Sequence, residues 1–210
     1  MNINNQLEVT KAVVQAYDKI AEKYNAAYAD NDLVDYQYMQ SFISALSGKN
    51  VLDMGCGCGE STGYLASKNI DVIGIDLSEN MLNEARHLYP FLRFEKQDIL
   101  STTFSKKSFD GVVLTYVINH FNDDGLRFLK SEIDRLLKDH GLVFLSAHVG
   151  EGEKLLPDPL DETIQIYYNF LNMKKLSSIF NDYSLLDCST RHSFGPEEFL
   201  CDKLFATYRK

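Results

Sequence analysis

The stretch that decides the fold is Val51-Leu-Asp-Met-Gly-Cys-Gly-Cys-Gly-Glu-Ser-Thr62. Its apolar start is typical of a short buried strand, and Gly55, Gly57 and Gly59 follow directly. Glycine tolerates a positive φ and lets a ligand approach the backbone closely. A helix that begins after such a loop offers unpaired N–H groups to an anionic group. The stretch therefore predicts a strand, a ligand-binding loop and a helix.

The segments around this loop alternate between strand and helix patterns. Strands are predicted at 51–54, 71–75, 92–96, 109–117, 142–149, 185–191 and 203–208, and helices around 13–24, 39–46, 81–88, 126–137 and 176–180. Alternation of this kind predicts a parallel sheet with helices on both faces, because right-handed crossovers return each strand to the same sheet. The last two strands have no helix between them and predict an antiparallel edge hairpin. Residues 150–169, which contain two prolines, are expected to form a loop.

Composition narrows the class of partner. The chain has 210 residues, with 21 Lys and Arg against 30 Asp and Glu, which gives a formal net charge of −9. Recognition of nucleic acid or of anionic lipid needs clustered basic residues, so we expect neither nucleic acid nor a membrane as partner. The polar first ten residues lack the apolar region of a signal peptide, and four cysteines are too few for a disulfide scaffold. A cytoplasmic location is therefore expected.

The length favours a single domain over residues 1–210. Within it we expect N-terminal cap helices over 1–47 and a cofactor-binding core over 48–149. Residues 150–210 are expected to supply a substrate-side loop, a helix and the edge strands.

Three acids stand where predicted parallel strands end: Asp53, Asp76 and Asp98. Ligands of open α/β sheets bind at the carboxyl ends of the strands. Asp53 would repel a pyrophosphate and suits a ligand that carries a positive group. Asp76 lies 21 residues after Gly55, the usual distance for a carboxylate that binds ribose hydroxyls. The three acids are also compatible with helix caps or turns, which is what most Asp residues after strands form.

Two other motif classes fit less well. The dinucleotide fingerprint requires a glycine at its sixth position, which Glu60 or Thr62 occupies here. No Gly-Lys-Ser/Thr sequence of a phosphate-binding loop is present. Cys56 and Cys58 alone cannot complete a tetrahedral metal site, so no metal is expected.

With these motifs the sequence resembles the class I S-adenosylmethionine-dependent methyltransferases, in particular those that act on small molecules. The resemblance covers residues 16–149 and is carried by the glycine loop, by Gly74-Ile-Asp-Leu-Ser-Glu-Asn-Met81, by Gln97-Asp98-Ile99 and by residues 108–115. It implies a Rossmann-like, seven-stranded, mostly parallel α/β fold. It also implies S-adenosylmethionine as the methyl donor, S-adenosylhomocysteine as the product and no metal.

By this resemblance, the loop of Gly55, Gly57 and Gly59 cradles the methionine part of the cofactor. Asp53 serves its amino group, directly or through water, and Asp76 binds both ribose hydroxyls. The resemblance extends to seven further residues, with Leu77 and Met81 beside the adenine, Asp98 and Ile99 at its amine, Thr115 near the methionine, and Tyr17 and Tyr24 closing over the cofactor. The two tyrosines lie on a helical stripe and are equally compatible with the core.

His120 is the candidate catalytic residue, because it follows the fourth predicted strand and an imidazole can accept a proton near neutral pH. The alternative is a partly exposed loop histidine. His148 ends the fifth strand and, with Glu151 and Glu153, is a candidate for the acceptor site or for a solvated loop. Three aromatic residues further on are candidates for an apolar lid or for the core: Tyr167, Tyr168 and Phe170.

We therefore expect a methyltransferase that transfers a methyl group in line to a small-molecule acceptor, as a monomer or homodimer. The modest N-terminal helix and the 150–169 segment predict a small, closed acceptor pocket. One alternative is a protein that binds S-adenosylmethionine without transferring the methyl group. A less favoured alternative is an NAD-dependent oxidoreductase.

Overall fold

The computed structural model describes residues 2–28, 32–193, 199 and 201–210, and the side chains of 32–34 are not described. The predicted ranges 1–47 and 150–210 thus include residues outside the described part, and the predicted domain limits stay a prediction. The main sheet has seven strands, which are β1 (Asn50–Met54), β2 (Asp71–Asp76), β3 (Arg93–Lys96), β4 (Phe109–Thr115), β5 (Leu137–His148), β8 (Ser184–Arg191) and β9 (Lys203–Arg209).

The sheet order is β3-β2-β1-β4-β5-β9-β8. The first five strands of the chain pair in parallel, whereas β9 pairs antiparallel with both β5 and β8. This confirms the predicted mostly parallel α/β sheet with its antiparallel C-terminal pair. The chain order reverses between β1 and β4, and a crevice for ligands forms at such a switch point, outside the carboxyl ends of the strands.

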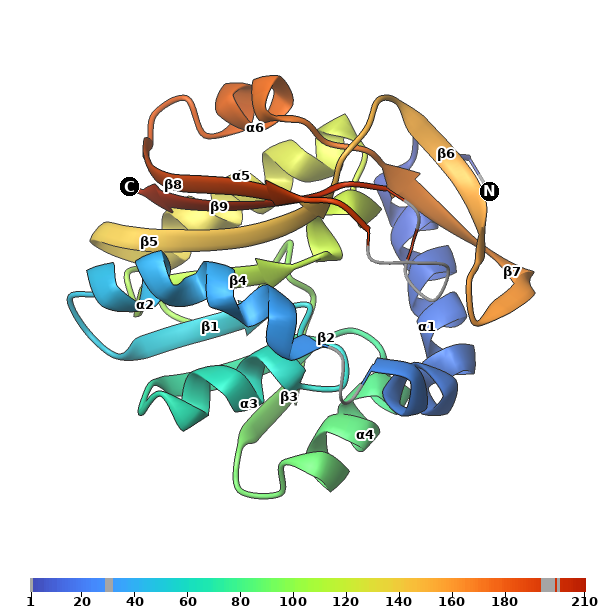
Figure 1. The fold of residues 1–210 in the computed structure, drawn as a ribbon, viewed down its shortest axis with the longest axis horizontal. Helices are drawn as coiled ribbons and strands as arrows, with labels where there is room; N and C mark the ends of the chain where they lie inside the picture. Colours follow the sequence, from blue (N-terminus) through green and yellow to red (C-terminus); the bar gives the residue numbers. More distant parts are fainter. Residues whose placement is uncertain (1, 29–31, 194–198, 200) are drawn as a thin grey trace.

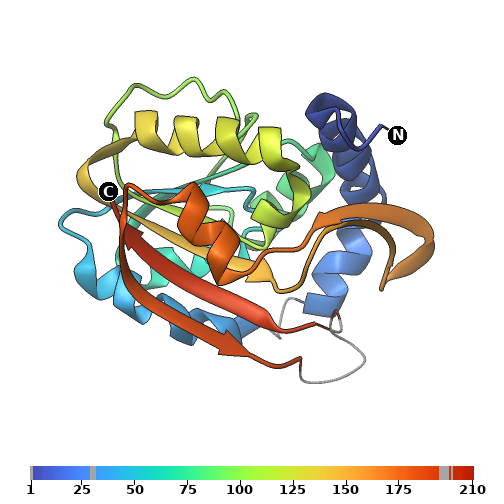
Figure 2. The same cartoon turned by 90° about the horizontal axis from the view of Figure 1, so that it is seen from above.

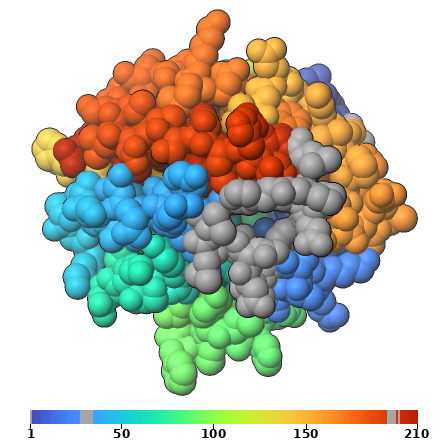
Figure 3. Space-filling model, viewed as in Figure 1, coloured from blue at the N-terminus to red at the C-terminus, as the bar shows by residue number. Residues whose placement is uncertain are grey.

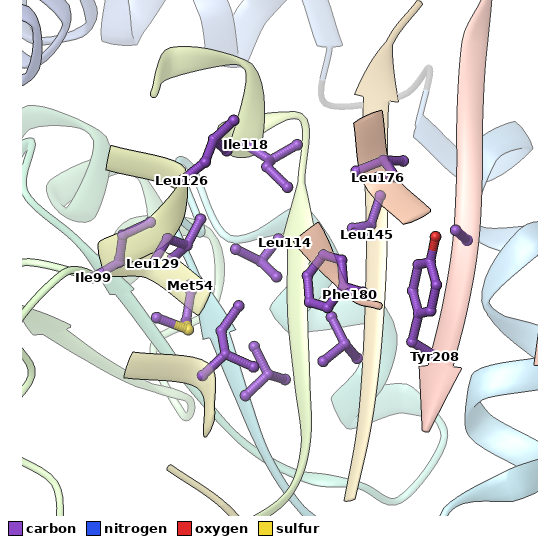
Figure 4. Packing of buried hydrophobic residues seen from close by; sticks show 14 of the residues in the cluster. Met54, Ile99, Leu114, Ile118, Leu126, Leu129, Leu145, Leu176, Phe180 and Tyr208 are labelled. Atoms are coloured by element: carbon purple, nitrogen blue, oxygen red, sulfur yellow. The ribbon is translucent and has the colours of Figure 1, made fainter. Parts of the chain in front are cut away.

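Helices cover both faces of the sheet (Figure 1). On one face, α5 (Asp123–Leu136) and α6 (Met173–Ile179) bury leucines against β4, β5 and β9, as the cluster in Figure 4 shows. On the other face, Phe42 of α2 (Gln40–Ala45) and Leu65 of α3 (Glu60–Ser67) are fully buried. Truncating such a residue to alanine typically costs about 2–5 kcal/mol, so these two layers fix the sheet.

Side-chain caps fix where the helices that flank the sheet begin. Ser78 Oγ accepts from the Met81 N–H at the start of α4 (Glu79–Leu88), and Asn122 caps α5 in the same way. Each cap satisfies a backbone N–H that has no partner within its helix. The cap at Ser78 also places the first turn of α4 directly after Asp76.

The prediction of a loop over 150–169 was wrong. These residues form a two-stranded antiparallel hairpin, β6 (Glu153–Asp158) with β7 (Asp161–Asn169). Proline is tolerated on an edge strand because its missing N–H can face away from the partner, and Pro157 lies in such a strand. Ile166 and Tyr167 are buried against α1 (Gln6–Tyr28), so α1 and the hairpin lie together at one end of the molecule (Figures 1 and 2).

Two short 3-10 segments complete the fold around the strand ends. One is η1 (Asp32–Met39), which precedes α2, and the other is η2 (Val117–His120), which follows β4. Within the described residues, no helix combines the length and the apolar character that a membrane span requires.

Candidate functional site

The loop after β1 has the backbone conformation that its glycines predict. Gly55, Gly57 and Gly59 have φ values of +75°, +54° and +88°. A Cβ built on Gly57 would meet no atom within 4 Å, whereas one on Gly59 would lie 2.8 Å from the ring of Phe94. The two glycines therefore serve different purposes, because Gly57 leaves open space and Gly59 allows close packing.

A pocket of about 800 Å³ lies at the carboxyl ends of β1, β2 and β4, beneath α1. In the space-filling view a hollow opens near the centre of this face (Figure 3). Most of the residues predicted for the site line this pocket: Tyr17, Tyr24, Gly55, Gly57, Asp76, Leu77, Met81, Asp98, Ile99, Thr115 and His120. The structure thus brings together residues that are up to 103 positions apart in the chain.

Asp76 closes the end of β2 and holds the loop in place. One carboxylate oxygen accepts the Gly57 N–H at 3.0 Å, and the other accepts the Ser78 N–H at 2.8 Å. Burial raises the pKa of this carboxyl, although the backbone hydrogen bonds oppose the shift. A carboxylate has about four lone-pair sites, so Asp76 can still accept hydroxyl donors from the pocket.

The floor of the pocket beyond Asp76 is apolar. Met81 and Ile99 are 2% and 5% exposed, and Leu77 lies beside them in the lining. Asp98 follows β3 and accepts the Leu100 N–H at 2.9 Å, which forms a tight turn. An apolar slot that ends at a carboxylate suits a flat ring that carries an N–H donor.

Asp53 does not line the pocket. Its buried carboxylate accepts the hydroxyl hydrogens of Ser61 and Thr62 at 2.5 and 2.6 Å, at the start of α3. Its second oxygen is buried without a hydrogen-bond partner, and burial raises its pKa to about 6. Asp53 therefore supports the loop from behind. Its interaction with the amino group of the cofactor, directly or through water, stays a prediction. Gly59 is likewise outside the lining, as its packing role requires.

His120 and Tyr17 form a hydrogen-bonded pair at the wall of the pocket. The Tyr17 hydroxyl lies 3.0 Å from His120 Nε2, and His120 Nδ1 lies 2.9 Å from the Tyr167 carbonyl oxygen. Only an N–H at Nδ1 can pair with a carbonyl, so Nε2 accepts the hydrogen of Tyr17. Burial lowers the pKa of His120 to about 4, which leaves the imidazole neutral at pH 7. The Tyr24 ring contacts Tyr17 edge to face at 6.0 Å between ring centroids.

Of the other candidates from the sequence, Tyr168 lies between His120 and His148, with ring centroids 5.2 and 5.7 Å away. His148 stacks on Tyr116 with ring centroids 4.9 Å apart, and burial keeps its pKa well below the usual value. Glu151 is exposed, so it fits the solvated loop that was the alternative interpretation. The three aromatic residues of the hairpin region, Tyr167, Tyr168 and Phe170, are buried against α1 and belong to the core.

Sequence reasoning missed the group formed by Tyr116, Asp35 and Arg191. The Tyr116 hydroxyl donates to Asp35, which also receives Arg191 in a bidentate ion pair. Asp35 lies in η1 and Arg191 ends β8, and neither belongs to a recognisable motif. The only signal was the position of Tyr116, directly after Thr115 at the end of a strand.

No group of three or more His, Cys, Asp or Glu side chains with metal-site geometry occurs among the residues that the structure describes. The four cysteines are free thiols.

Comparison with known proteins identifies relatives for the core of the chain. Residues 51–141 match the family described as "Methyltransferase domain". The putative methyltransferase YqeM of Bacillus subtilis is 33% identical over 148 residues, which are 61% of this chain and 57% of that protein. The demethylmenaquinone methyltransferase of Renibacterium salmoninarum is 26% identical over 118 residues, 53% of this chain and 48% of that protein. The matched part of this chain thus spans about half the length of these curated relatives.

Solved structures extend the likeness to almost the whole fold. The DhpI–SAH complex has a TM-score of 0.72 against this chain, with 20% identity over 96% of each chain. At this identity the likeness concerns the fold alone.

Proposed function

We propose that this chain, whose residues 51–141 form a class I S-adenosylmethionine-dependent methyltransferase domain, transfers a methyl group from that cofactor to a small-molecule acceptor. The domain match and the fold confirm the family resemblance seen in the sequence. Membership of the family leaves two properties of this chain open, namely whether it transfers the methyl group and to which class of acceptor.

One observation carries the proposal: a carboxylate, an open glycine and an apolar slot meet in one pocket at the switch point of the sheet. These groups fit the parts of S-adenosylmethionine. In this proposal Asp76, which lines the pocket, accepts ribose hydroxyls, and the open space at Gly57 supports the close approach of a ligand to the backbone. Met81 and Ile99 would flank the adenine, with Asp98 as the acceptor of its amine hydrogen.

When bound, S-adenosylmethionine supplies an electrophilic methyl group on a sulfonium that leaves as a neutral thioether. The chain contributes alignment and exclusion of water, which require no acidic or basic side chain. Alignment alone can lower a barrier by about 7–11 kcal/mol. Tyr17 and Tyr24 on α1 cover the pocket and are placed to keep it dry.

The environment of His120 argues for a positioning role. A pKa of about 4 makes the imidazole a weak base, and its Nε2 is already engaged by the Tyr17 hydroxyl. We therefore propose that His120 fixes Tyr17 above the pocket. A His120→Gln variant is expected to keep a flat turnover profile between about pH 6 and 9, because no group with a pKa in that range would be lost. An inflection in this range that wild type shows and His120→Gln lacks would return His120 to the chemical step.

The small-molecule acceptor and a cytoplasmic setting rest on supporting observations. The net charge of −9 disfavours a nucleic-acid acceptor, and the free thiols are typical of a reducing compartment. The expectation that the chain works as a monomer or as a homodimer stays a prediction.

Transfer of a labelled methyl group tests the proposal. The protein is incubated with S-adenosylmethionine that carries a radioactive methyl group and with a protein-free metabolite extract. We expect label to enter a small molecule with the wild-type protein and to fall strongly with Asp76→Ala. Cofactor binding without label transfer would favour a binding protein instead. Enhanced NADH fluorescence on mixing would favour an oxidoreductase.

A further inference from the structure

The loop that follows β3 carries two residues of the cofactor pocket. Asp98 and Ile99 line this pocket, and residues 97–108, which connect β3 to β4, form neither a strand nor a helix. Ile99 also belongs to the core cluster that contains the buried leucines of α5 (Figure 4). Backbone groups outside helices and sheets need other hydrogen-bond partners where water is excluded. The partners of residues 98–104, the 98–104 loop, therefore decide how firmly Asp98 and Ile99 are held.

An ion pair on α5 supplies several of these partners. Glu132 Oε1 accepts the Thr102 N–H at 2.8 Å and the Thr102 hydroxyl hydrogen at 2.7 Å. Arg135 donates to the Phe104 carbonyl oxygen at 2.6 Å and to the Thr102 carbonyl oxygen at 3.2 Å. The same guanidinium binds both carboxylate oxygens of Glu132, at 2.6 and 2.7 Å. The main chain of the 98–104 loop is thus attached to α5 by side chains alone at Thr102 and Phe104.

The geometry of this ion pair makes it a rigid support. The pair is bidentate, and the Glu132 side chain is only 9% exposed. Burial opposes ionisation of Glu132, but the hydrogen bonds from Arg135 and Thr102 outweigh it and lower the pKa of this carboxyl. Charge-assisted bidentate bonds are strong and fix the relative orientation of the two planar groups. The carbonyl oxygens of the loop therefore meet donors whose directions are fixed.

Asp98 is held from both directions along the chain. Upstream, the Gln97 N–H donates to the Asp76 carbonyl oxygen at 3.1 Å, which ties the residue after β3 to the end of β2. Downstream, the Asp98 carbonyl oxygen accepts the Ser101 N–H at 3.1 Å, one residue before Thr102. A displacement of Thr102 would therefore reach Asp98 through a single tight turn. Of the two attachments, only the downstream one depends on side chains of α5.

We propose that Glu132 and Arg135 are positioning residues for the adenine end of the cofactor pocket, and that they set its preference for adenine over hypoxanthine. Neither residue lines the pocket, so both act through the 98–104 loop. The inference rests on the proposed function, in which Asp98 accepts the adenine amine. Hypoxanthine carries a carbonyl oxygen in place of that amine, and this oxygen would face the carboxylate as a second acceptor. A firmly held loop cannot move away from this repulsion, so it rejects the wrong base.

Calorimetry with S-adenosylhomocysteine and S-inosylhomocysteine tests this inference in wild type and Arg135→Met. Methionine keeps much of the apolar stem of arginine and removes the guanidinium. We expect wild type to prefer the adenine ligand at least about tenfold, which corresponds to about 1.4 kcal/mol. In Arg135→Met the adenine ligand should bind about five- to tenfold more weakly, and the hypoxanthine ligand should change less than about twofold. A merely structural defect would weaken both ligands by the same factor.

Lys130→Met is the matched control on the same helix. Lys130 pairs with Asp134 at 2.8 Å, and its side chain is 12% exposed. It lines neither the cofactor pocket nor the smaller pocket of about 510 Å³ that adjoins it at the glycine loop. Lys130→Met should keep the wild-type preference. If Arg135→Met does not fold, Thr102→Val removes only the hydroxyl shared by Glu132 and Arg135, and it should lower the preference about two- to threefold.

The outcomes separate the inference from the proposed function. Equal preferences in wild type and Arg135→Met, an equal loss of preference in Lys130→Met, or a wild type without preference would overturn the inference alone. A wild-type preference in Thr102→Val would overturn it where Arg135→Met does not fold. Failure of S-adenosylhomocysteine to bind wild type would overturn the proposed function as well.

Discussion

Gly57 and Gly59 lie two positions apart and should respond differently to alanine. At Gly59 a Cβ would clash with Phe94 in addition to forcing a φ of +88°, so Gly59→Ala should lower the free energy of unfolding by about 2–4 kcal/mol. At Gly57 a Cβ meets nothing within 4 Å and fills space in the pocket wall. Gly57→Ala should therefore cost only about 1–2 kcal/mol of stability but weaken cofactor binding at least about tenfold.

Gly152 provides the matched control for Gly57. It also has a positive φ, +74°, and a Cβ there would meet nothing within 4 Å, but it lines neither pocket. Gly152→Ala should match Gly57→Ala in urea unfolding and leave the calorimetric affinity for S-adenosylhomocysteine unchanged. Equal affinities of the two variants would argue against the glycine loop as the cofactor site.

His120 should give the protein a pH-dependent stability. Between pH 6.5 and its folded pKa of about 4, the unfolded imidazole binds a proton that the folded one does not. The free energy of unfolding should therefore fall as the pH falls through this interval, by on the order of 3 kcal/mol relative to His120→Gln. Urea unfolding at several pH values measures the difference between the two slopes.

Two other groups titrate in the same interval but are common to both proteins. Burial lowers the pKa of His148, which acts in the same direction as His120. Asp53, with a raised pKa of about 6, acts in the opposite direction, because its folded form takes up a proton first as the pH falls. Parallel slopes for wild type and His120→Gln would show that His120 is not buried as a neutral imidazole.

At the scale of elements, α1 is the part whose attachment should control cofactor release. Asp18 on α1 accepts the Ser78 hydroxyl at 2.5 Å and the Asn80 N–H at 3.2 Å, which ties α1 to the start of α4. Asp18→Ala should loosen the attachment of α1 to α4. It should raise the dissociation rate of S-adenosylhomocysteine about tenfold, which corresponds to about 1.4 kcal/mol of binding free energy. Stopped-flow displacement measures this rate.

Lys23→Ala serves as the control on the same helix. Lys23 pairs with Asp161 of the hairpin at 2.8 Å, but its side chain is 56% exposed. Such surface pairs contribute about 0–1 kcal/mol, so the dissociation rate should change little. A release rate of Asp18→Ala equal to that of wild type would mean that α1 is not the element that gates the pocket.

The elements also show where sequence patterns succeed and fail. The five parallel strands and the edge pair were predictable, because doubly buried strands are continuous apolar runs followed by glycine or acid residues. The β6–β7 hairpin was missed because Pro157 lies within β6 and Pro159 lies at the turn, and proline in a sequence is a signal for a loop. Its buried residues, such as Ile166, find their partners on α1, and this long-range pairing leaves no local signal.

At the scale of the whole molecule, the sequence predicted most residues that line the pocket at the ends of β1, β2 and β4, but it did not predict the group of Tyr116, Asp35 and Arg191 beside it. Asp76 and Asp98 stand at fixed distances from the glycine loop, so their convergence follows from the parallel topology. Tyr116 directly follows β4, Asp35 lies in η1 and Arg191 ends β8, and only the folded chain brings the three together. The sequence placed Asp53 among the ligands, yet its side chain accepts the hydroxyl hydrogens of Ser61 and Thr62 at the start of α3, behind the loop.

Ligand binding should stabilise the whole chain by mass action. S-adenosylhomocysteine at about 100 times its Kd should add about 2.7 kcal/mol to the free energy of unfolding. For a domain of this size, that corresponds to a rise in Tm of about 5–10 °C. Thermal unfolding with and without the ligand checks this expectation, and an unchanged Tm at saturating concentration would contradict it.

The central claim is that the pocket at the ends of β1, β2 and β4 binds the methyl-donor cofactor through Asp76. Isothermal calorimetry of S-adenosylhomocysteine with wild type and with Asp76→Ala tests it most directly. We predict saturable one-to-one binding to wild type and a loss of about 1–3 kcal/mol in Asp76→Ala, because the ribose hydroxyls lose a charged acceptor. Equal affinity in the two proteins, or no binding to wild type, would contradict the account.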